Sequence, residues 1–400
     1  MPWKVSDVYE ARVRFVLGVE RGDLSISAVC DAHGISRETG YKWLARYRAG
    51  GLDGLRDLSR APQRQAGSMA SAVSAAIVAL RRKHRFWGPK KLRAVLERDY
   101  PGTSWPAPST IGDLLRREGL VEARRLRRRG IPVEQPFAPV EAANDLWCID
   151  FKGWFRTGDG RRCDPLTVTD AQSRYLLACE ALEPTGAEVE RACDRLFREY
   201  GLPRAMRMDN GTPFASSGAA GLTRLSVGWV KLGIRLERID PGSPQQNGRH
   251  ERMHRTLKQQ TAQPPAANAR EQQAKFDDFR REFNEQRPHE ALGQVTPASR
   301  YTASRRSYPV AIEELCYAGA HEVRHVRTDG AIKFRGKEVY VSQALAGELV
   351  GLFEIDDDQW LVRFAELDIG IFGRGRKLER FASARPGRRK TKATGAVSTM

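Results

Sequence analysis

The sequence contains no long hydrophobic run. No stretch of about 18 apolar residues occurs in its 400 residues, which excludes a transmembrane helix. Its first residues carry charges where a signal peptide would have an apolar region, so they do not direct secretion. We therefore expect a cytoplasmic protein with no membrane partner.

Cysteine is also scarce, with six residues in the chain. None of them forms a CxxC pair, which excludes a zinc ribbon and a thioredoxin-type redox motif. In a cytoplasmic protein such cysteines are most simply reduced and buried.

Positive charge, by contrast, is abundant. Lys and Arg number 67 against 49 Asp and Glu, for a formal net charge of +18. Such an excess attracts a polyanion, and nucleic acid is the obvious one. Charge alone leaves open a ribosome-associated or merely soluble basic protein, and it does not indicate any chemistry.

The first 55 residues predict a helix-turn-helix DNA-binding domain. Three helices are expected within residues 5–50, and the third follows a turn at Gly34 with Ser36 as its N-cap. That third helix, RETGYKWLARYR, is basic and aromatic, as in a recognition helix. Its candidate DNA contacts are Arg37, Lys42 and Arg46. An ordinary helical hairpin with a solvated basic face is the alternative.

Residues 70–130 predict a second helix-turn-helix domain. Three helices are again expected, and Pro89 is tolerated in the first turn of the middle one. The candidate DNA contacts on this helix are Lys90, Lys91 and Arg93. The arginine-rich run EARRLRRRG at 122–130 is either a solvated, flexible face or a linker that contacts the phosphates of DNA between the two DNA-binding regions.

From residue 144 the pattern changes to strands. Three strands in a meander are followed by a helix, a strand, a helix, a strand and two further helices. This order is that of a ribonuclease-H-like α/β fold, which we place at 140–303, although periodicity alone leaves other α/β folds open. Short strands then predict a small SH3-like β-barrel at 318–375, followed by a basic disordered tail at 376–400.

Three acidic residues stand out within the expected α/β domain. Asp150 lies inside the first strand, Asp209 at the end of the fourth, and Glu251 in the first turns of a helix. Taken singly, Asp209 is an ordinary turn residue and Glu251 an ordinary partner of the helix dipole. Aspartate is disfavoured inside strands, however, and a buried carboxylate needs a partner or a cation. Clustered together, the three would hold divalent cations suited to in-line displacement at phosphorus.

Several motifs carry a resemblance to a known family. They are LWCIDF, VTDAQSRYLLA, RMDNGTPF, DPGSPQQNGRHERMHRTLK and FNEQRPHEALGQVTPASRY. In this order they resemble the integrase-type DDE transposases of bacterial insertion sequences, whose core is shared with retroviral integrases. The resemblance is close over 144–301 and looser over the flanking segments.

The resemblance implies a site and a reaction. Asp150, Asp209 and Glu251 would be the catalytic triad, binding two Mg²⁺ ions with Mn²⁺ as a substitute. The enzyme would cut element ends by water attack and then join the freed 3′-OH to target DNA. Its partners would be double-stranded DNA, as element ends and target, and further copies of itself in a synaptic complex. The implied location is the bacterial cytoplasm, in association with the nucleoid.

Other residues near the motifs receive lesser roles. Asn210, Gln245 and Asn247 would support the site or contact DNA. The candidate DNA contacts of this region are Asn247, Arg252, Arg255 and Lys258. His250 and His254 are expected to be solvated, Asp170 to be a hydrogen-bonding residue at a strand end, and His321 and His325 not to bind zinc.

The chain departs from the family pattern in two ways. The segment between Asp209 and Glu251 is longer than the commonest integrase spacing, with the extra length in ASSGAAGLTRLSVGWVKLGI. The His-His-Cys-Cys zinc domain of retroviral integrases is absent, and helix-turn-helix units replace it. Two alternatives remain: a non-catalytic DNA-binding protein that acts as a repressor at element ends, and a plain nuclease. Intact acids favour an active enzyme, and end-recognition domains disfavour a plain nuclease.

Overall fold

The computed structural model describes residues 7–57, 69–121, 137, 139–240, 246, 248–373 and 377–381, apart from the side chain of Arg249. The chain divides into two compact units, Met1–Met69 and Ala70–Met400. Among the helices in the described residues, none is both long and apolar enough to span a membrane.

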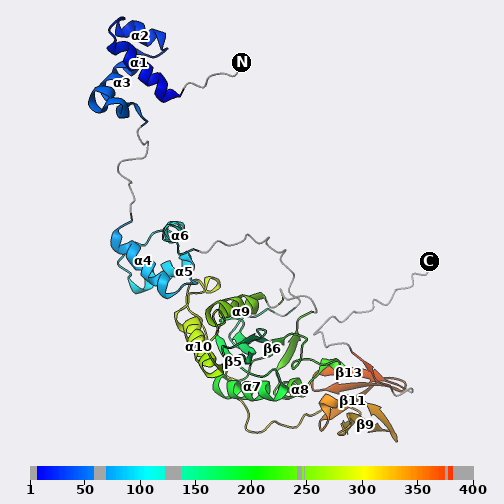
Figure 1. Ribbon diagram of the computed structural model, residues 1–400. Coiled ribbons are helices and arrows are strands. Elements are labelled where there is room, and N and C mark those ends of the chain that lie inside the picture. Colours follow the sequence, from blue (N-terminus) through cyan, green and yellow to red (C-terminus); the bar gives the residue numbers. More distant parts are fainter. Residues whose placement is uncertain are drawn as a thin grey trace, which may run out of the picture. The chain divides into compact units, whose positions relative to one another are not determined.

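The first unit is a small helical domain (Figure 1). It contains α1 (Val8–Glu20), α2 (Ile26–Ala32), α3 (Arg37–Gly50) and the 3₁₀ helix η1 (Gly51–Leu55). As predicted, Ser36 caps α3, and its Oγ accepts a hydrogen bond from the Thr39 amide at 3.2 Å. A Cβ at Gly40 would lie 2.5 Å from Cys30 Sγ, so glycine lets α3 pack closely on α2. The predicted helix-turn-helix arrangement is confirmed.

The second unit begins with three further helices, α4 (Ser71–Lys83), α5 (Pro89–Asp99) and α6 (Pro108–Arg117). They pack around buried side chains such as Leu92 and Ile111. These helices belong to the same compact unit as the residues that follow them, and the boundary between the two units lies at residue 69. The boundary of a distinct second domain at 70–130 stays a prediction, and the arginine-rich run lies outside the described residues.

A five-stranded sheet forms the centre of this unit. Its strands are β1 (Trp147–Phe151), β4 (Pro165–Asp170), β5 (Leu176–Ala181), β6 (Ala205–Met208) and β7 (Arg235–Arg238). They lie in the order β5-β4-β1-β6-β7; β4 is antiparallel to β1 and β5, whereas β6 is parallel to β1 and β7. This is the ribonuclease-H-like order, and the predicted fold class is confirmed. A short ribbon, β2 (Phe155–Arg156) and β3 (Arg162–Cys163), extends from β1.

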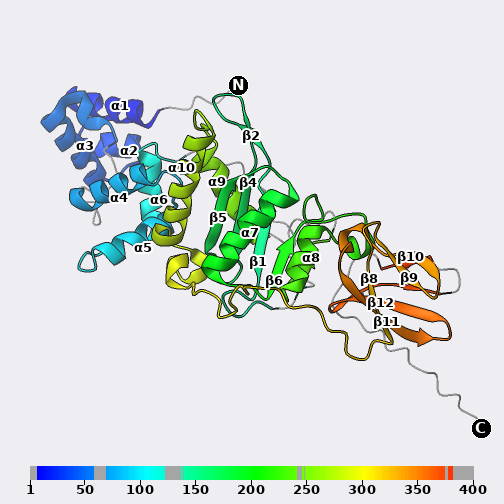
Figure 2. The same ribbon diagram turned by 90° about the horizontal axis from the view of Figure 1, so that it is seen from below.

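Helices cover both faces of the sheet. Helices α7 (Gly186–Tyr200) and α8 (Arg224–Lys231) lie on one face (Figure 2). Helices α9 (Gly248–Thr261) and α10 (Ala269–Arg281) lie on the other. Because side chains alternate along a strand, Trp147 and Ile149 enter the α7 core, and Asp150 faces α9.

The outer edge of β5 is covered by polar side chains from α10 and the π-helical turn η4 (Glu282–Gln286). The Asn284 side chain accepts a hydrogen bond from the Leu176 amide at 2.8 Å and donates to its carbonyl at 2.9 Å. The Gln273 side chain accepts a hydrogen bond from the Ala181 amide at 2.9 Å and donates to the Cys179 carbonyl at 3.0 Å. Backbone groups that an edge strand leaves free are thereby satisfied within the chain.

The C-terminal part is formed by short strands. Five make one sheet: β8 (Glu322–His325), β11 (Leu349–Asp356), β12 (Gln359–Phe364), β13 (Leu367–Phe372) and β14 (Glu379–Arg380). A separate ribbon consists of β9 (Ala331–Phe334) and β10 (Lys337–Tyr340). No pairing among the described strands closes the ring, so the SH3-like barrel stays a prediction. Residues 376–400 were predicted to be a disordered tail, but Glu379 and Arg380 within it form β14 and pair with β13, so the prediction is wrong there; residues 382–400 are not among those the structure describes.

The extra segment between Asp209 and Glu251 packs against this C-terminal sheet. Ala219 and Ala220 of the 3₁₀ helix η2 (Ala219–Gly221) are buried in the same hydrophobic core as the C-terminal strands. On α8, Lys231 forms an ion pair with Glu348 at 2.9 Å. The added length therefore forms a docking surface and leaves the sheet order unchanged.

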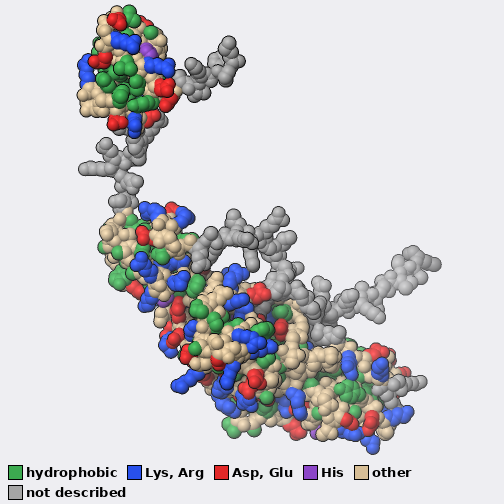
Figure 3. All heavy atoms as spheres, in the orientation of Figure 1, with side chains coloured by type: hydrophobic (Ala, Val, Ile, Leu, Met, Phe, Trp, Pro, Cys, Tyr) green, Lys and Arg blue, Asp and Glu red, His purple; other side chains and the backbone are tan. Residues whose placement is uncertain are grey.

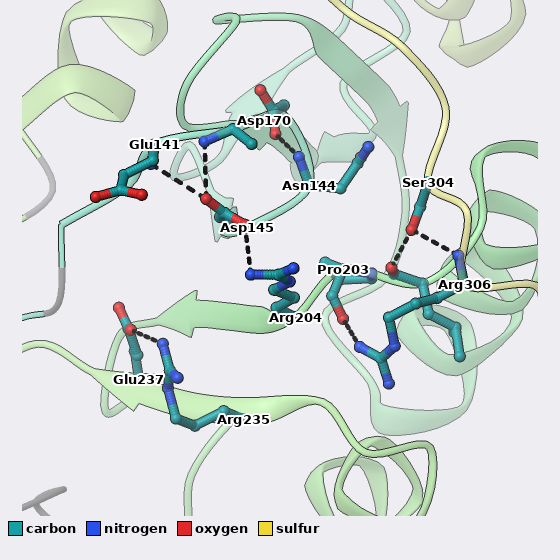
Figure 4. Close-up of polar contacts among 12 residues, drawn as sticks. Glu141, Asn144, Asp145, Asp170, Pro203, Arg204, Arg235, Glu237, Ser304 and Arg306 are labelled. Carbon is teal, nitrogen blue, oxygen red and sulfur yellow. Dashed lines mark hydrogen bonds and ion pairs between the residues drawn. The ribbon is translucent and has the colours of Figure 1, made fainter.

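The connection between the two sheets is also fixed to the central one (Figure 4). Ser304 Oγ donates to the Leu202 carbonyl at 2.7 Å, and Arg306 donates to the Pro203 carbonyl at 2.6 Å. Nearby, Asp170 accepts a hydrogen bond from the Asn144 amide at 2.7 Å. Asp170 is thus the strand-end hydrogen-bonding residue that the sequence predicted.

Candidate active site

Asp150 and Asp209 lie at the same edge of the central sheet. Asp150 is the fourth residue of β1, and Asp209 directly follows β6. Because β1 and β6 are parallel neighbours, their carboxyl ends meet at one edge. The topology thus explains how two acids far apart in sequence come into one site.

Glu251 is brought to this edge by α9. The helix starts at Gly248 and buries His250, Met253, His254 and Leu257, at the i, i+3, i+4 and i+7 spacing of a helical face. Glu251 lies outside this stripe, in the first turn, and its side chain is exposed. The buried stripe therefore fixes the helix while Glu251 stays accessible.

Electrostatics link the three acids. Burial, followed by the negative charge of Asp209, raises the pKa of Asp150 from 3.8 to about 7, and Glu251 contributes in the same direction. Asp209 and Glu251 are therefore both close enough to Asp150 to disfavour a negative charge on it. A cation bound among them would relieve that repulsion, so the residues present fit a divalent metal ion.

The loop after β6 shapes the position of Asp209. Its Oδ1 accepts a hydrogen bond from the Gly211 amide at 3.1 Å. A Cβ at Gly211 would lie 3.1 Å from Asp209 Oδ2, so a larger residue would crowd the carboxylate. Asn210, predicted as a supporting residue, donates from its side chain to the Ile239 carbonyl at 2.5 Å. The Asp-Asn-Gly sequence thus ties this loop to the end of β7.

The approach to α9 is fixed by residues that sequence analysis missed. The Gln246 side chain accepts from the Asp240 amide at 2.7 Å and donates to the Asp240 carboxylate at 3.0 Å. Arg207 and Glu237, both buried, form an ion pair at 2.9 Å, and Arg207 also donates to the Gln246 carbonyl. Gln245 and Asn247 lie outside the described residues, so their predicted roles stay predictions.

The expectation that His250 and His254 are solvated is wrong. Their exposed fractions are 2% and 5%, and both rings contact strand β4. Burial lowers the pKa of His250 to about 3 and that of His254 further still, so both rings are neutral. The helical spacing with Met253 and Leu257 was the pattern that would have revealed this.

The tightest group of possible metal ligands in the described residues is not the acid triad. Asp150, His250 and His254 each offer an atom within 4.8 Å of the others. His254 Nδ1 lies 3.7 Å from Asp150 Oδ2. The carboxylates of Asp209 and Glu251 act on Asp150 through their charge and do not complete so close a set.

On α3, the candidate DNA contacts differ in their surroundings. Arg37 is exposed and donates to Ser27 Oγ, and Lys42 is exposed. Arg46 is half-buried, donates to the Arg56 carbonyl at 2.6 Å and stacks over Trp43. Arg46 therefore packs within its own domain, while the other two face solvent.

On α5, Lys90 forms an ion pair with Glu290, and Lys91 donates to the Pro288 carbonyl. Burial, followed by the charge of Arg287, lowers the pKa of Lys91 to about 8. Arg93 is half-buried and pairs with Glu97 on the same helix at 2.7 Å. The two lysines thus contact the segment after α10.

On α9, Arg252, Arg255 and Lys258 are exposed along the face that carries Glu251. Lys and Arg side chains, with acidic ones between them, are spread over the face of the 70–400 unit in Figure 3. The α9 residues therefore remain accessible beside the acids.

Known domain families match most of the chain. Two models described as integrase core domain match residues 140–244 and 232–297. A helix-turn-helix domain matches residues 11–63, and a homeodomain-like domain matches residues 39–115.

Two similar proteins come from bacterial insertion elements. The 31.7 kDa protein of insertion element IS407 from Burkholderia multivorans is 32% identical over 253 residues, which is 61% of this chain and 86% of that protein. The 39.2 kDa protein of IS476 from Xanthomonas euvesicatoria is 30% identical over 233 residues, which is 57% of this chain and 64% of that protein.

Among solved structures, the chain is similar to the catalytic core domain of BIV integrase and to the simian T-cell lymphotropic virus intasome. The first has 22% identity and a TM-score of 0.31, covering 39% of this chain and 92% of that one. The second has 15% identity and a TM-score of 0.36, and the match covers 77% of this chain and 100% of that one.

Proposed function

Because this chain belongs to the integrase-type transposases of bacterial insertion sequences, we propose that it cuts the ends of its element and joins them to target DNA. The observation that carries this proposal is the placement of Asp150 and Asp209 at the carboxyl ends of two parallel strands, with Glu251 in the first turn of α9 and with burial, Asp209 and Glu251 all raising the pKa of Asp150. Carboxylates gathered in this way would be neutralised by a divalent cation, which suits metal-dependent phosphoryl transfer.

Divalent cations, two Mg²⁺ ions or Mn²⁺ in their place, would activate the attacking oxygen and stabilise the leaving one. The chain's own residues would position these ions and the DNA. Asp150, Asp209 and Glu251 would hold the ions, because burial and the charges of Asp209 and Glu251 disfavour a negative charge on Asp150 unless a cation is bound. The turn at Gly211 and the buried face of α9 hold the two outer carboxylates in place.

DNA would be held by the basic residues that remain exposed. Glu251 lies on the same helix as three exposed basic residues, Arg252, Arg255 and Lys258. DNA whose phosphates bind these residues would lie close to the acids. Arg37 and Lys42 would contact element ends through the helix-turn-helix domain. Two ends must be held for joining, and we infer that copies of the chain assemble on DNA.

The experiment uses the full chain and a labelled DNA fragment that carries an element end. With Mg²⁺ or Mn²⁺, the wild-type protein should nick the end and join its 3′-OH to a second DNA. Asp150→Asn should abolish both steps. Asp278→Asn, which removes an exposed carboxylate on α10, should leave both unchanged.

Other outcomes would support different functions. DNA binding without nicking in wild type and variant alike would indicate a DNA-binding protein without catalytic activity. Nicking that depends on Asp150 but is never followed by joining would indicate a nuclease. Either result would overturn the proposal.

A further inference from the structure

Two buried histidines lie directly beside the candidate active site. His250 and His254 are one helical turn apart on α9, and their rings meet edge to face with centroids 4.5 Å apart. Both contact Thr167 of β4, the residue paired with Asp150 across the sheet. They therefore connect the helix of Glu251 to the strand of Asp150.

The protons in this contact can be assigned. The Thr167 hydroxyl donates to the Asp150 carbonyl at 3.1 Å, which uses its single proton. His250 Nε2 at 2.8 Å and His254 Nε2 at 2.6 Å must then both donate to Thr167 Oγ1. His250 Nδ1 in turn accepts from Thr169 Oγ1 at 2.8 Å.

This assignment leaves a lone pair on His254 Nδ1, which faces Asp150. The separation of His254 Nδ1 and Asp150 Oδ2, 3.7 Å, is too long for a hydrogen bond. Two neighbouring ligand atoms bound to one cation at about 2.1 Å lie about 3.0 Å apart in octahedral and about 3.4 Å apart in tetrahedral geometry. The two atoms are thus within a few tenths of an ångström of the spacing of ligands to a common ion.

The contact to Thr167 also fits that role. A metal-ligating histidine nearly always donates its other ring N–H to an oxygen acceptor, which fixes the ring and its tautomer. His254 makes that bond through Nε2, and its ring is 95% buried with only Nδ1 directed at the carboxylate. His250 differs, because both of its nitrogens are bonded to threonine hydroxyls.

We propose that His254 Nδ1 is a further ligand of the cation held by Asp150. The inference rests on the proposed metal-dependent function and adds one nitrogen to an otherwise all-oxygen site. Nitrogen ligands favour cations such as Mn²⁺, Co²⁺ and Zn²⁺ over Mg²⁺, which prefers oxygen. The site should therefore bind Mn²⁺ more tightly than Mg²⁺.

The test is Mn²⁺ binding to the full chain without DNA. Electron spin echo envelope modulation should detect nitrogen coupling to the bound ion in the wild-type protein. His254→Gln keeps a donor near Thr167 and removes Nδ1, so it should lose the coupling. It should also lower Mn²⁺ affinity by roughly tenfold or more, with Mg²⁺ affinity changed much less.

His250→Gln is the matched control, because it alters the neighbouring buried ring without touching the Asp150 face. It should retain the nitrogen coupling. Mn²⁺ bound to the wild-type protein without nitrogen coupling would overturn the inference, whether or not the variants fold. If Mn²⁺ binding is instead unaffected by Asp150→Asn, the proposed function fails as well, and the two failures are thereby distinguished.

Discussion

Asp150→Asn should stabilise the metal-free protein while abolishing its activity. In the wild-type protein the pKa of Asp150 is raised from 3.8 to about 7, by burial first and then by Asp209. Between these pH values the folded protein keeps a proton that the unfolded chain releases. The free energy of unfolding therefore decreases as the pH rises through this window.

The magnitude follows from the shift. A change of one pKa unit corresponds to about 1.4 kcal/mol. Ionised Asp150 therefore lowers the free energy of unfolding by about 4 kcal/mol at most above pH 7. At pH 5 it is about 2 kcal/mol, and below pH 4 it disappears. Asparagine carries no charge at any of these pH values, so the variant escapes the cost.

The assay is thermal denaturation in EDTA at several pH values. Asp150→Asn should melt several degrees above the wild-type protein at pH 8, and the difference should shrink as the pH falls towards 4. Saturating Mn²⁺ at 100 times its Kd should stabilise the wild-type protein by about 2.7 kcal/mol and the variant hardly at all. A variant that melts at or below the wild-type temperature at pH 8 would refute the raised pKa of Asp150.

Other contacts give further expected outcomes. Arg207→Ala removes the buried partner of Glu237 and leaves it only the more exposed Arg235, so the free energy of unfolding in urea should fall by up to about 3–5 kcal/mol; a negligible loss would contradict the buried pair. Arg255→Ala and Lys258→Ala should each weaken the salt dependence of DNA binding, measured by fluorescence anisotropy in EDTA. The slope of the logarithm of the binding constant against the logarithm of the salt concentration should become shallower by about 0.9, and an unchanged slope would exclude that phosphate contact. Ala219→Asp inserts a charge into the core shared with the C-terminal sheet, so limited proteolysis should release the C-terminal part faster; an unchanged rate would contradict the docking.

The order of predicted strands and helices was sufficient for the fold class of the central domain, whereas the catalytic roles of the three acids stay predictions. The alternation around Asp150 and the position of Asp209 before Asn-Gly are local patterns, and they survive in the structure as a strand interior and a strand end. The parallel pairing of β1 and β6 is encoded by no local pattern and is known only from the structure.

What the sequence could not predict depends on partners that are distant along the chain. The role of Thr167 follows from its register opposite Asp150 and from rings on α9. Lys90 and Lys91 are indistinguishable from DNA-binding lysines until Pro288 and Glu290 are placed beside them. His250 and His254 are different, because the wrong expectation that they are solvated overlooked a local signal, their helical spacing with Met253 and Leu257.

The polar side chains along β5 have a consequence for assembly. With Asn284 and Gln273 occupying its backbone groups, β5 is unavailable for pairing with a strand of another molecule. In the proposed assembly on DNA, copies of this chain therefore cannot join their sheets through that edge into a continuous β-structure. Any contact at this edge has to be made by side chains.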